Sequence, residues 1–256
     1  MEPHKLEIVR QGQGTPPPVR NLSRESFLRK FTREWEADQH VSLIGPTGRG
    51  KTYTARQLLE RRDGKVLILA PKGVDKTLTG FGEKIEKWPP VSFDFWNASE
   101  GWPGAKKDPA NAKKYRLEPK LNKPEDMAKM RGYFADALRD VFRQQHWTVY
   151  CDELQVTADP RMMGLGKLVE SILLMGRSRE VSMVSSIQVP RWAPRAAYDQ
   201  ASHVLLWRQR DKPARDRIGE ISGVDTRAVI ETVVDLDFHE FLWVDATKDK
   251  LYRVAP

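Results

Sequence analysis

One eight-residue segment, Gly-Pro-Thr-Gly-Arg-Gly-Lys-Thr, constrains the fold of this chain more than any other feature of its sequence. It matches the pattern G-x-x-x-x-G-K-[ST], and it lies between a predicted strand, His40 to Ile44, and a predicted helix, Thr52 to Arg61. Glycines at these positions let the backbone wrap so that successive N–H groups point inward, and the helix that follows contributes the positive end of its dipole. The segment therefore predicts a phosphate-binding loop made of Gly45, Pro46, Thr47, Gly48, Arg49, Gly50, Lys51 and Thr52.

Such a loop predicts that the chain binds ATP together with Mg²⁺. Lys51 is expected to reach the β and γ phosphates, and the hydroxyl of Thr52 is expected to ligate the metal ion. The alternative interpretation is an ordinary glycine-rich turn between a strand and a helix. Because the motif is complete and lies where the mechanism needs it, the phosphate-binding interpretation is the stronger one.

A pair of acidic residues forms the second candidate motif. Asp152 and Glu153 directly follow a short apolar stretch, Trp147 to Cys151, which predicts a buried central strand. Asp152 is expected to hold Mg²⁺ through its water shell, and Glu153 to orient and polarise the attacking water. Acidic pairs after strands are common by chance, but here the phosphate loop that such a pair would serve is already present. Kinases of small molecules usually lack this glutamate, because their acceptor is not water.

The order of the predicted elements indicates an α/β fold in which a mainly parallel central sheet is flanked by helices. The last two predicted strands are separated by a polar turn and form a C-terminal β-hairpin. Further helices are predicted to start at Ser23, at Pro124, and at Asp159, which would cap its helix with Pro160 in the first position. Further strands are predicted at Lys65 to Ala70, Val91 to Trp96, Val181 to Ile187, His203 to Trp207, Glu240 to Val244 and Lys250 to Val254.

The length of 256 residues fits one compact α/β core. Residues 1–22 contain a run of three prolines and predict a flexible N-terminal arm, which leaves residues 23–256 as a single ATPase domain. Within that domain, residues 97–123 are rich in lysine and almost without aliphatic side chains. We interpret them as a basic surface insertion.

The net charge of +8 and the isoelectric point near 9.5 favour a polyanionic partner such as DNA, although many basic proteins simply have a solvated basic surface. The five histidines lack metal-ligand spacing, so Mg²⁺ bound with the nucleotide is the metal that we expect. The candidate contacts to DNA phosphates are the basic insertion with Trp102 and Tyr115, and Arg191, Arg195, Arg208 and Arg210. Each of them also fits the alternative interpretation of a solvated surface residue.

Features of localisation also follow from the sequence. Cys151 is the single cysteine, which excludes an internal disulfide framework. No stretch approaches the roughly eighteen apolar residues of a spanning helix, and the N-terminus lacks the apolar segment of a signal peptide. We expect a cytoplasmic protein, in the cytoplasm of a bacterial host if its source is viral, which partners would bring to a membrane or capsid.

Three residues beyond the acidic pair resemble the pattern of the FtsK/HerA family of DNA-pumping ATPases. That family has an arginine after the corresponding helix, a glutamine eleven residues later and a proline two residues beyond, and Arg177, Gln188 and Pro190 match this spacing. The pair Lys72-Gly73 is similar to what relatives in conjugative transfer carry after the second strand. The resemblance covers roughly Val41 to Trp207 and implies a RecA-like fold of the type with an additional strand and a catalytic glutamate. One departure is Glu180, where the family often has glycine.

The resemblance implies roles for two of these residues. Arg177 would be an arginine finger that enters the ATP site of a neighbouring subunit, and Gln188 would sense the γ-phosphate and relay hydrolysis to the DNA contacts. Two other interpretations stay open, namely that Arg179 is the finger or that Arg177 complements a helix C-terminus as an ordinary cation.

The function implied by this resemblance is ATP-driven translocation of double-stranded DNA, in the packaging of a phage genome or the transfer of a mobile element. A finger that acts on a neighbour implies a homo-oligomer, and a ring of five subunits, a ring of six and a ring induced by DNA are all compatible with it. Capsid, portal or membrane-channel proteins would be partners, and the chain itself is not expected to insert into a membrane. The alternative is an ATP-dependent switch or adaptor that hydrolyses slowly, with the basic insertion as its docking surface.

Overall fold

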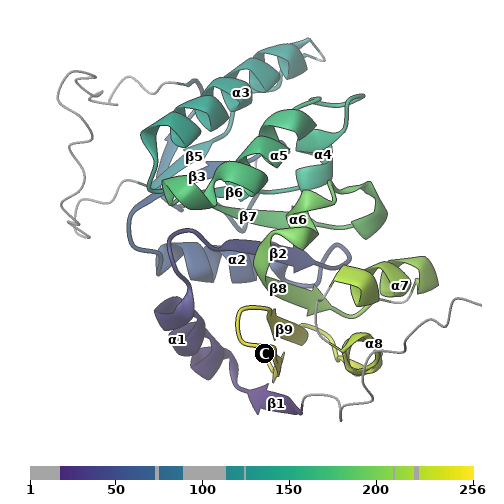
Figure 1. Ribbon diagram of the computed structural model, residues 1–256. Helices are drawn as coiled ribbons and strands as arrows, with labels where there is room; N and C mark the ends of the chain where they lie inside the picture. The colour runs from purple at the N-terminus through teal and green to yellow at the C-terminus, as the bar shows by residue number, and fades with distance from the viewer. Residues whose placement is uncertain (1–17, 73–74, 89–113, 124, 210, 222–224) are drawn as a thin grey trace, which may run out of the picture.

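The computed structural model of the chain describes residues 18–72, 75–88, 114–123, 125–209, 211–221 and 225–256, with side chains placed in 211–218 but not in 219–221. These residues form one sheet with helices on both of its faces (Figure 1). The strands are β1 (Val19–Leu22), β2 (His40–Ile44), β3 (Lys65–Leu69), β4 (Glu83–Ile85), β5 (Lys114–Leu117), β6 (Trp147–Cys151), β7 (Ser182–Ile187), β8 (Ala201–Trp207), β9 (Phe241–Asp245) and β10 (Lys250–Val254).

The ten strands are ordered β1-β10-β9-β8-β2-β7-β6-β3-β5-β4. Every neighbouring pair is parallel except the two pairs that β9 makes with β8 and β10. The predicted α/β fold with a mainly parallel sheet and a C-terminal hairpin is confirmed.

The position of β7 determines how the site is assembled. It pairs with β2, which leads into the phosphate loop, and with β6, which ends at the acidic pair. The strand β7 is thus the additional strand that the predicted fold class requires between the strand of the phosphate loop and the strand of the acidic pair. Because all three strands are parallel, their carboxyl ends meet at one edge of the sheet, where ligands of open α/β sheets bind.

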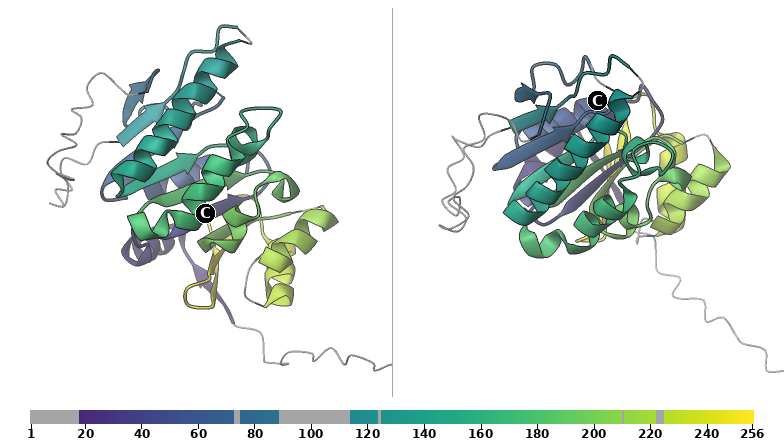
Figure 2. Two further views of the ribbon diagram at one scale, coloured as in Figure 1. Left: turned by 45° about the horizontal axis from the view of Figure 1, so that its top comes forward. Right: turned by 90° about the horizontal axis from the view of Figure 1, so that it is seen from above.

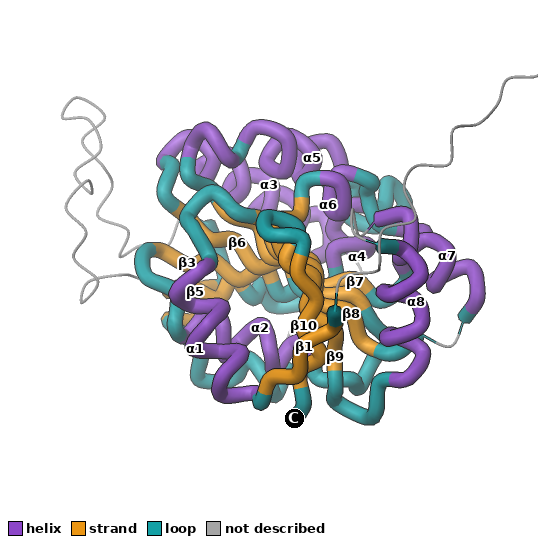
Figure 3. The backbone as a smooth tube through the Cα atoms, turned by 60° about the horizontal axis from the view of Figure 1, so that its bottom comes forward, coloured by secondary structure: helices purple, strands orange, loops and turns teal. Residues whose placement is uncertain are grey.

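Helices cover the sheet on both sides (Figure 3). The helix α3 is the longest of the described helices and lies across one face (Figure 2). None of the helices in the described part of the chain is long and apolar enough to cross a membrane. The helices are α1 (Arg24–Glu34), α2 (Lys51–Glu60), α3 (Asp126–Gln144), α4 (Leu154–Ala158), α5 (Gly166–Met175), α6 (Ala196–Asp199), α7 (Lys212–Ile221) and α8 (Thr226–Asp235), with 3₁₀ turns η2 (Arg177–Arg179) and η3 (Pro190–Trp192).

Two hydrophobic clusters form because successive residues of a strand face opposite sides of the sheet. On one side, Leu43 of β2 packs with side chains of α1 and α2. On the other, the next residue, Ile44, belongs to the cluster that contains Phe134 of α3 and Ile172 of α5. All the central strands are buried along their length, as expected for a parallel sheet covered on both faces.

The helix α1 forms as its sequence predicts. The hydroxyl of Ser23 accepts a hydrogen bond of 3.2 Å from the backbone N–H of Ser26, which caps the helix. Phe27, Phe31 and Trp35 recur every four residues and are all buried. The ring of Phe31 lies 5.3 Å from that of Phe27 and 5.5 Å from that of Trp35, so the aromatic stripe holds α1 against the sheet.

The boundaries of two predicted segments differ in the structure. The arm predicted for residues 1–22 is wrong at its end, because Val19–Leu22 form β1 and pair with β10; residues 1–17 lie outside the described residues. The basic insertion predicted for 97–123 is wrong from residue 114, because Lys114–Leu117 form β5, in which Tyr115 is buried. Residues 97–113 and the predicted strand Val91 to Trp96 lie outside the described residues.

The helix predicted to begin at Asp159 and Pro160 is also wrong. Asp159 ends α4 instead, and its carboxylate accepts a hydrogen bond of 2.8 Å from the backbone N–H of Arg161. The next helix, α5, starts at Gly166. Asp followed by Pro is typical of turns as well as of helix starts, and here the turn is the structure that forms.

Candidate active site

The three glycines of the phosphate loop are required for two different reasons. Gly48 and Gly50 have φ angles of 77° and 93°, in the left-handed region that glycine adopts without strain. Gly45 has no such angle, but a Cβ atom on it would lie 2.6 Å from the Cβ of Trp207 on β8. The loop therefore turns at two glycines and leaves β2 beside a tryptophan where only glycine fits.

Lys51 lies at the first position of α2 and is buried. Its Nζ donates hydrogen bonds to the backbone oxygens of Gly45 at 2.6 Å and Pro46 at 2.9 Å. Burial lowers the pKa of Lys51 to about 8, although the carboxylates of Asp152 and Glu153 oppose this shift. The ammonium group is thus held over the loop, where added negative charge would stabilise its protonated form.

Thr52 and Asp152 lie side by side, as the sequence predicts for a pair that holds Mg²⁺. The hydroxyl of Thr52 is 3.4 Å from Oδ1 of Asp152, and the same oxygen accepts a hydrogen bond of 2.8 Å from the hydroxyl of Tyr150. Burial raises the pKa of Asp152, and the Tyr150 hydrogen bond acts in the opposite direction. A carboxylate that is costly to keep ionised without a partner is well suited to hold a divalent cation.

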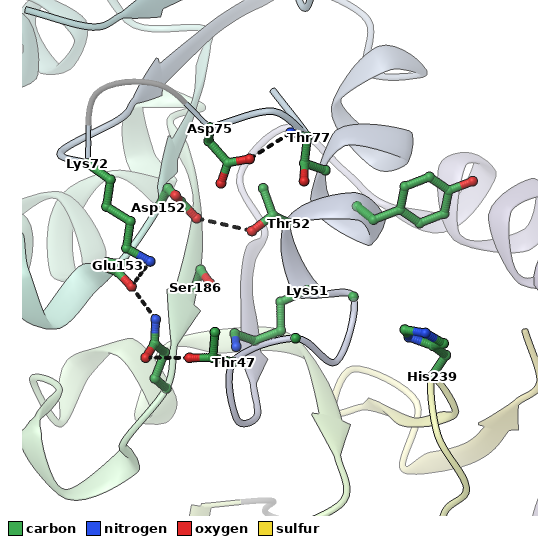
Figure 4. Close-up of a pocket in the computed structure, with 14 residues that line it drawn as sticks. Thr47, Lys51, Thr52, Lys72, Asp75, Thr77, Asp152, Glu153, Ser186 and His239 are labelled. Carbon is green, nitrogen blue, oxygen red and sulfur yellow. Dashed lines mark hydrogen bonds and ion pairs between the residues drawn. The ribbon is translucent and has the colours of Figure 1, made fainter. Parts of the chain in front are cut away.

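Glu153 lies at the end of β6 in an unusual backbone conformation, with a φ angle of 65°. Its carboxylate pairs with Nζ of Lys72 and accepts a hydrogen bond from Nε2 of Gln188. Oε1 of Gln188 in turn accepts a hydrogen bond of 3.0 Å from the hydroxyl of Thr47 in the phosphate loop. Figure 4 shows this chain of contacts, which links the catalytic candidate to the loop through one side chain. A non-glycine residue in a left-handed conformation is often found at functional sites.

These residues surround a cavity of about 330 Å³. Its lining fits ATP with Mg²⁺. The phosphate loop and the ammonium groups of Lys51 and Lys72 would hold the phosphates, and the Thr52 hydroxyl and the Asp152 carboxylate would hold the metal ion. The arrangement also provides Glu153 as a carboxylate that can orient water. The cavity can therefore bind a nucleoside triphosphate and position water against it.

Of the residues predicted from the resemblance, Gln188 lines the cavity of its own chain and Arg177 does not. Gln188 directly follows β7. Arg177 lies in η2, with its side chain half exposed and its Nε 3.8 Å from Asp38, and it does not line the cavity of its own chain. Arg179 places its guanidinium 4.5 Å from the centre of the Phe142 ring. Glu180, the departure from the family pattern, adopts a φ angle of 52°, which glycine would adopt more readily.

Sequence reasoning missed several residues that line the cavity, among them Tyr53, Asp75, Ser186 and His239. Tyr53 directly follows the loop motif and could have been noticed there. His239 has no signal in the sequence, because it lies in the turn before β9. The antiparallel β9 begins opposite the end of β8, where Phe241 pairs with Trp207, so this turn is brought to the edge where the phosphate loop lies.

Comparisons with known proteins support the fold. No family model matches the sequence, and no curated protein matches it. Among solved structures, the genome packaging NTPase B204 from Sulfolobus turreted icosahedral virus 2, in complex with sulfate, has a TM-score of 0.58 at 15% identity over 87% of this chain and 98% of that chain. VirB4 of Thermoanaerobacter pseudethanolicus has a TM-score of 0.61 at 15% identity over 84% of this chain and 88% of that one.

A third similar structure is the cytoplasmic domain of the Type VII secretion ATPase EccC of Thermomonospora curvata. Its TM-score is 0.55 at 15% identity, over 85% of this chain and 25% of that chain. At this level of identity the likeness concerns the fold. The chain therefore has the fold of the FtsK/HerA-type P-loop ATPases, as the motifs in its sequence predicted.

Proposed function

We propose that this protein is an ATPase that uses hydrolysis to translocate double-stranded DNA, in the packaging or transfer of a viral or mobile genome. The observation that carries the proposal is the side chain of Gln188, which joins Thr47 of the phosphate loop to the carboxylate of Glu153. A residue in this position is in contact with the γ-phosphate end of the cavity and with the group that orients water. It can report the state of the nucleotide to the strand that carries it.

The proposed hydrolysis assigns a task to each residue at this end of the cavity. Lys51 and the loop amides hold the phosphates, and bound Mg²⁺ supplies neutralisation of the charge on their oxygens. Thr52 and Asp152 hold the ion. Glu153 orients and polarises the water that attacks the γ-phosphate. Lys72 and Gln188 both contact Oε1 of Glu153, so Oε2 is the oxygen that would take the water.

A path from Gln188 to the surface supports its role as a relay. Its backbone N–H donates a hydrogen bond of 3.1 Å to Oε1 of Gln155 on α4, and the turn η3 begins two residues later at Pro190. A shift of the Gln188 backbone would therefore be passed to α4 through Gln155 and to η3 along the chain. Arg191 in η3 is one of the candidate DNA contacts on this route.

Arg177 is proposed to act as the arginine finger of a ring-shaped homo-oligomer with five or six subunits. Its half-exposed side chain, outside its own cavity, suits a role in the site of a neighbour. The test is to mix two inactive variants, Arg177→Ala and Glu153→Gln, which in a ring would regenerate some complete sites. Recovery of hydrolysis on mixing is expected, and Arg179→Ala is expected to stay active by itself. No recovery on mixing, or an Arg179→Ala variant that is inactive alone and recovers equally when mixed, would contradict this assignment.

The likeness to B204, whose structures include a complex with ATP-γS at a TM-score of 0.59, supports ATP as the ligand and genome packaging as a setting. The net charge of +8 supports a nucleic-acid partner. Tyr115 is withdrawn as a DNA contact, because it is buried in β5. Arg195 is exposed but paired with Asp199 at 2.8 Å. Capsid, portal or channel proteins are the proposed partners.

The test is steady-state ATP hydrolysis with and without long double-stranded DNA. DNA is expected to stimulate the wild type, and Glu153→Gln is expected to abolish hydrolysis while ATP still binds. Glu231→Gln is a matched control, because Glu231 is an exposed glutamate paired with Arg227 on α8. Hydrolysis that is indifferent to DNA would refute the translocase.

An ATP-dependent switch or adaptor is the second candidate, and one observation favours it. Lys72 and Gln188 both contact Oε1 of Glu153, and these contacts would make the carboxylate a weaker base and slow hydrolysis until a partner releases it. Tight ATP binding with negligible turnover, even with DNA and at high protein concentration, would support this candidate. Rapid DNA-stimulated turnover would exclude it.

A further inference from the structure

Two aromatic side chains that the hydrolysis chemistry does not use, Tyr53 and His239, line the same cavity. Figure 4 shows His239 on the opposite side of Lys51 from Glu153. If the γ-phosphate faces Glu153, the rest of the nucleotide must extend along the loop toward α2 and away from that carboxylate. The base of the nucleotide then leaves the loop where Tyr53 follows Thr52 and where His239 lies against the loop.

His239 is held against the phosphate loop by several contacts. Its Nδ1 lies 3.4 Å from the backbone oxygen of Arg49, and a Cβ atom on Gly50 would be 3.4 Å from the same nitrogen. The residue has a φ angle of 68°, a conformation that a non-glycine residue adopts only when its surroundings impose it. Next to it, the exposed ring of Phe238 packs edge-on at 4.2 Å and lies under the Arg49 guanidinium at 4.6 Å.

The turn that carries His239 is fixed by charged groups. The backbone N–H of Asp237 donates a hydrogen bond of 2.8 Å to Glu240, whose carboxylate accepts a second one of 2.6 Å from Arg253 of β10. Burial would raise the pKa of Glu240, but the hydrogen bonds from Arg253 and Asp237 outweigh it and hold the pKa below its usual value. The turn that carries the His239 imidazole is therefore held in place by these hydrogen bonds.

The side chain of Tyr53 is also held in place by its neighbours. Its hydroxyl accepts a hydrogen bond of 3.3 Å from Gln57, and the guanidinium of Arg24 lies 5.7 Å from the centre of its ring. Arg24 is itself anchored by a hydrogen bond of 2.8 Å to Thr54. More than half of the Tyr53 side chain is nevertheless exposed, at 54%. An anchored aromatic ring with a free face, beside a nucleotide cavity, is suited to stack on a base.

We propose that Tyr53 and His239 form the base-binding subsite, and that they recognise a purine by the area of its rings and not by hydrogen bonds to its edge. The inference rests on the proposed nucleotide-binding role of the same cavity. Gly48 and Gly50 of the loop offer no side chain to a base. Asp75 and Thr77 also line the cavity, but Oδ1 of Asp75 accepts a hydrogen bond of 2.7 Å from the backbone N–H of Thr77, so this carboxylate is engaged within its own segment. Stacking depends on ring area, so ATP and GTP are bound alike and pyrimidine triphosphates less well.

The test is calorimetric titration of the full chain with Mg²⁺ complexes of ATP, GTP, CTP and inorganic tripolyphosphate, without DNA. For the wild type we expect ATP and GTP to differ by less than about threefold and to bind about tenfold more tightly than CTP, since base stacking differs chiefly with ring area. A preference for ATP over GTP of about a hundredfold, or equal binding of ATP and CTP, would overturn the proposal.

Variants assign the effect to the two rings. Tyr53→Leu and His239→Asn are each expected to weaken ATP about tenfold and leave tripolyphosphate unchanged, while Tyr53→Phe keeps the affinity of the wild type. Asparagine tolerates the left-handed backbone of His239, so the loss would reflect the ring. Trp192→Ala is the control, because Trp192 is equally exposed, at 60%, and lies outside the cavity. Equal weakening of ATP and tripolyphosphate would refute the subsite, whereas base-selective binding without DNA-stimulated hydrolysis would refute only the translocase.

Discussion

The substitution Gly45→Ala tests the closest approach of two strands at the candidate site. A methyl group on Gly45 would lie 2.6 Å from Cβ and 3.3 Å from Cγ of Trp207, whereas carbon atoms in proteins normally approach to about 3.5–4.0 Å. The neighbouring atom is attached directly to the backbone of β8, so it cannot swing away as the tip of a long side chain would. Relief requires β2 and β8 to separate.

The expected cost is that of overpacking a core, about 1–3 kcal/mol. For a chain of this size that loss lowers the melting temperature by about 2–12 °C, at roughly 2–4 °C per kcal/mol. Gly132→Ala is the matched control, since Gly132 lies in α3 and an added Cβ would meet nothing within 4 Å. That substitution should stabilise the protein by about 0.5–1 kcal/mol, because alanine favours the helix.

Both variants would be compared with the wild type by urea unfolding, without nucleotide, followed by circular dichroism. Equal slopes of the free energy of unfolding against urea would show that the change lies in stability and not in the extent of unfolding. A Gly45→Ala protein as stable as the wild type would refute the close approach of the loop to β8. A destabilised Gly132→Ala protein would refute the argument from open space around α3.

Three further outcomes follow from the described contacts. Burial lowers the pKa of His40 to about 4, and its ring is held neutral because Nδ1 accepts a hydrogen bond from the N–H of Met183 while Nε2 donates to Leu173. The unfolded chain therefore binds a proton that the folded one does not, and urea titrations should show stability falling as the pH drops from roughly 6.5 to 4, by up to about 3 kcal/mol. Asp152→Asn should weaken ATP binding in Mg²⁺ by about 10–100-fold and leave binding in EDTA little changed, as measured by calorimetry. Phe31→Ala should cost about 3–5 kcal/mol in urea unfolding, because its buried ring packs on four other aromatic rings, whereas exposed Trp192→Ala should stay within about 0.5 kcal/mol.

The central part of the fold was predictable because its signals are local. The apolar segments that became β2, β6 and β7 are short, and each is followed by the residues of a motif. A parallel sheet brings the carboxyl ends of its strands together at one edge. The prediction that each motif follows a strand of one parallel sheet was therefore enough to predict that the motifs form one site.

Errors occurred where a local pattern had two meanings. The Asp159-Pro160 pair fits a helix start and a turn equally well, and in the structure Asp159 ends α4, with its backbone N–H bonded to the oxygen of Gln155. Lys114 and Arg116 look like surface cations, yet they belong to β5. There, Nζ of Lys114 donates a hydrogen bond of 2.9 Å to the oxygen of Leu59, and the guanidinium of Arg116 donates to the oxygens of Leu78 and Phe81. Long basic side chains can be buried in this way when backbone oxygens receive them.

The sequence by itself determined the phosphate loop and the strand that ends at Asp152 and Glu153, because each depends on residues within a few positions of one another. The resemblance to the FtsK/HerA family singled out Gln188 through its spacing from Arg177. Only the tertiary structure decided which groups face one another across the cavity. Lys72 reaches Glu153 because β3 and β6 are neighbours, and His239 reaches the loop because β9 runs antiparallel to β8. Strand order and direction are set by packing over the whole sheet, and no local segment of sequence encodes them.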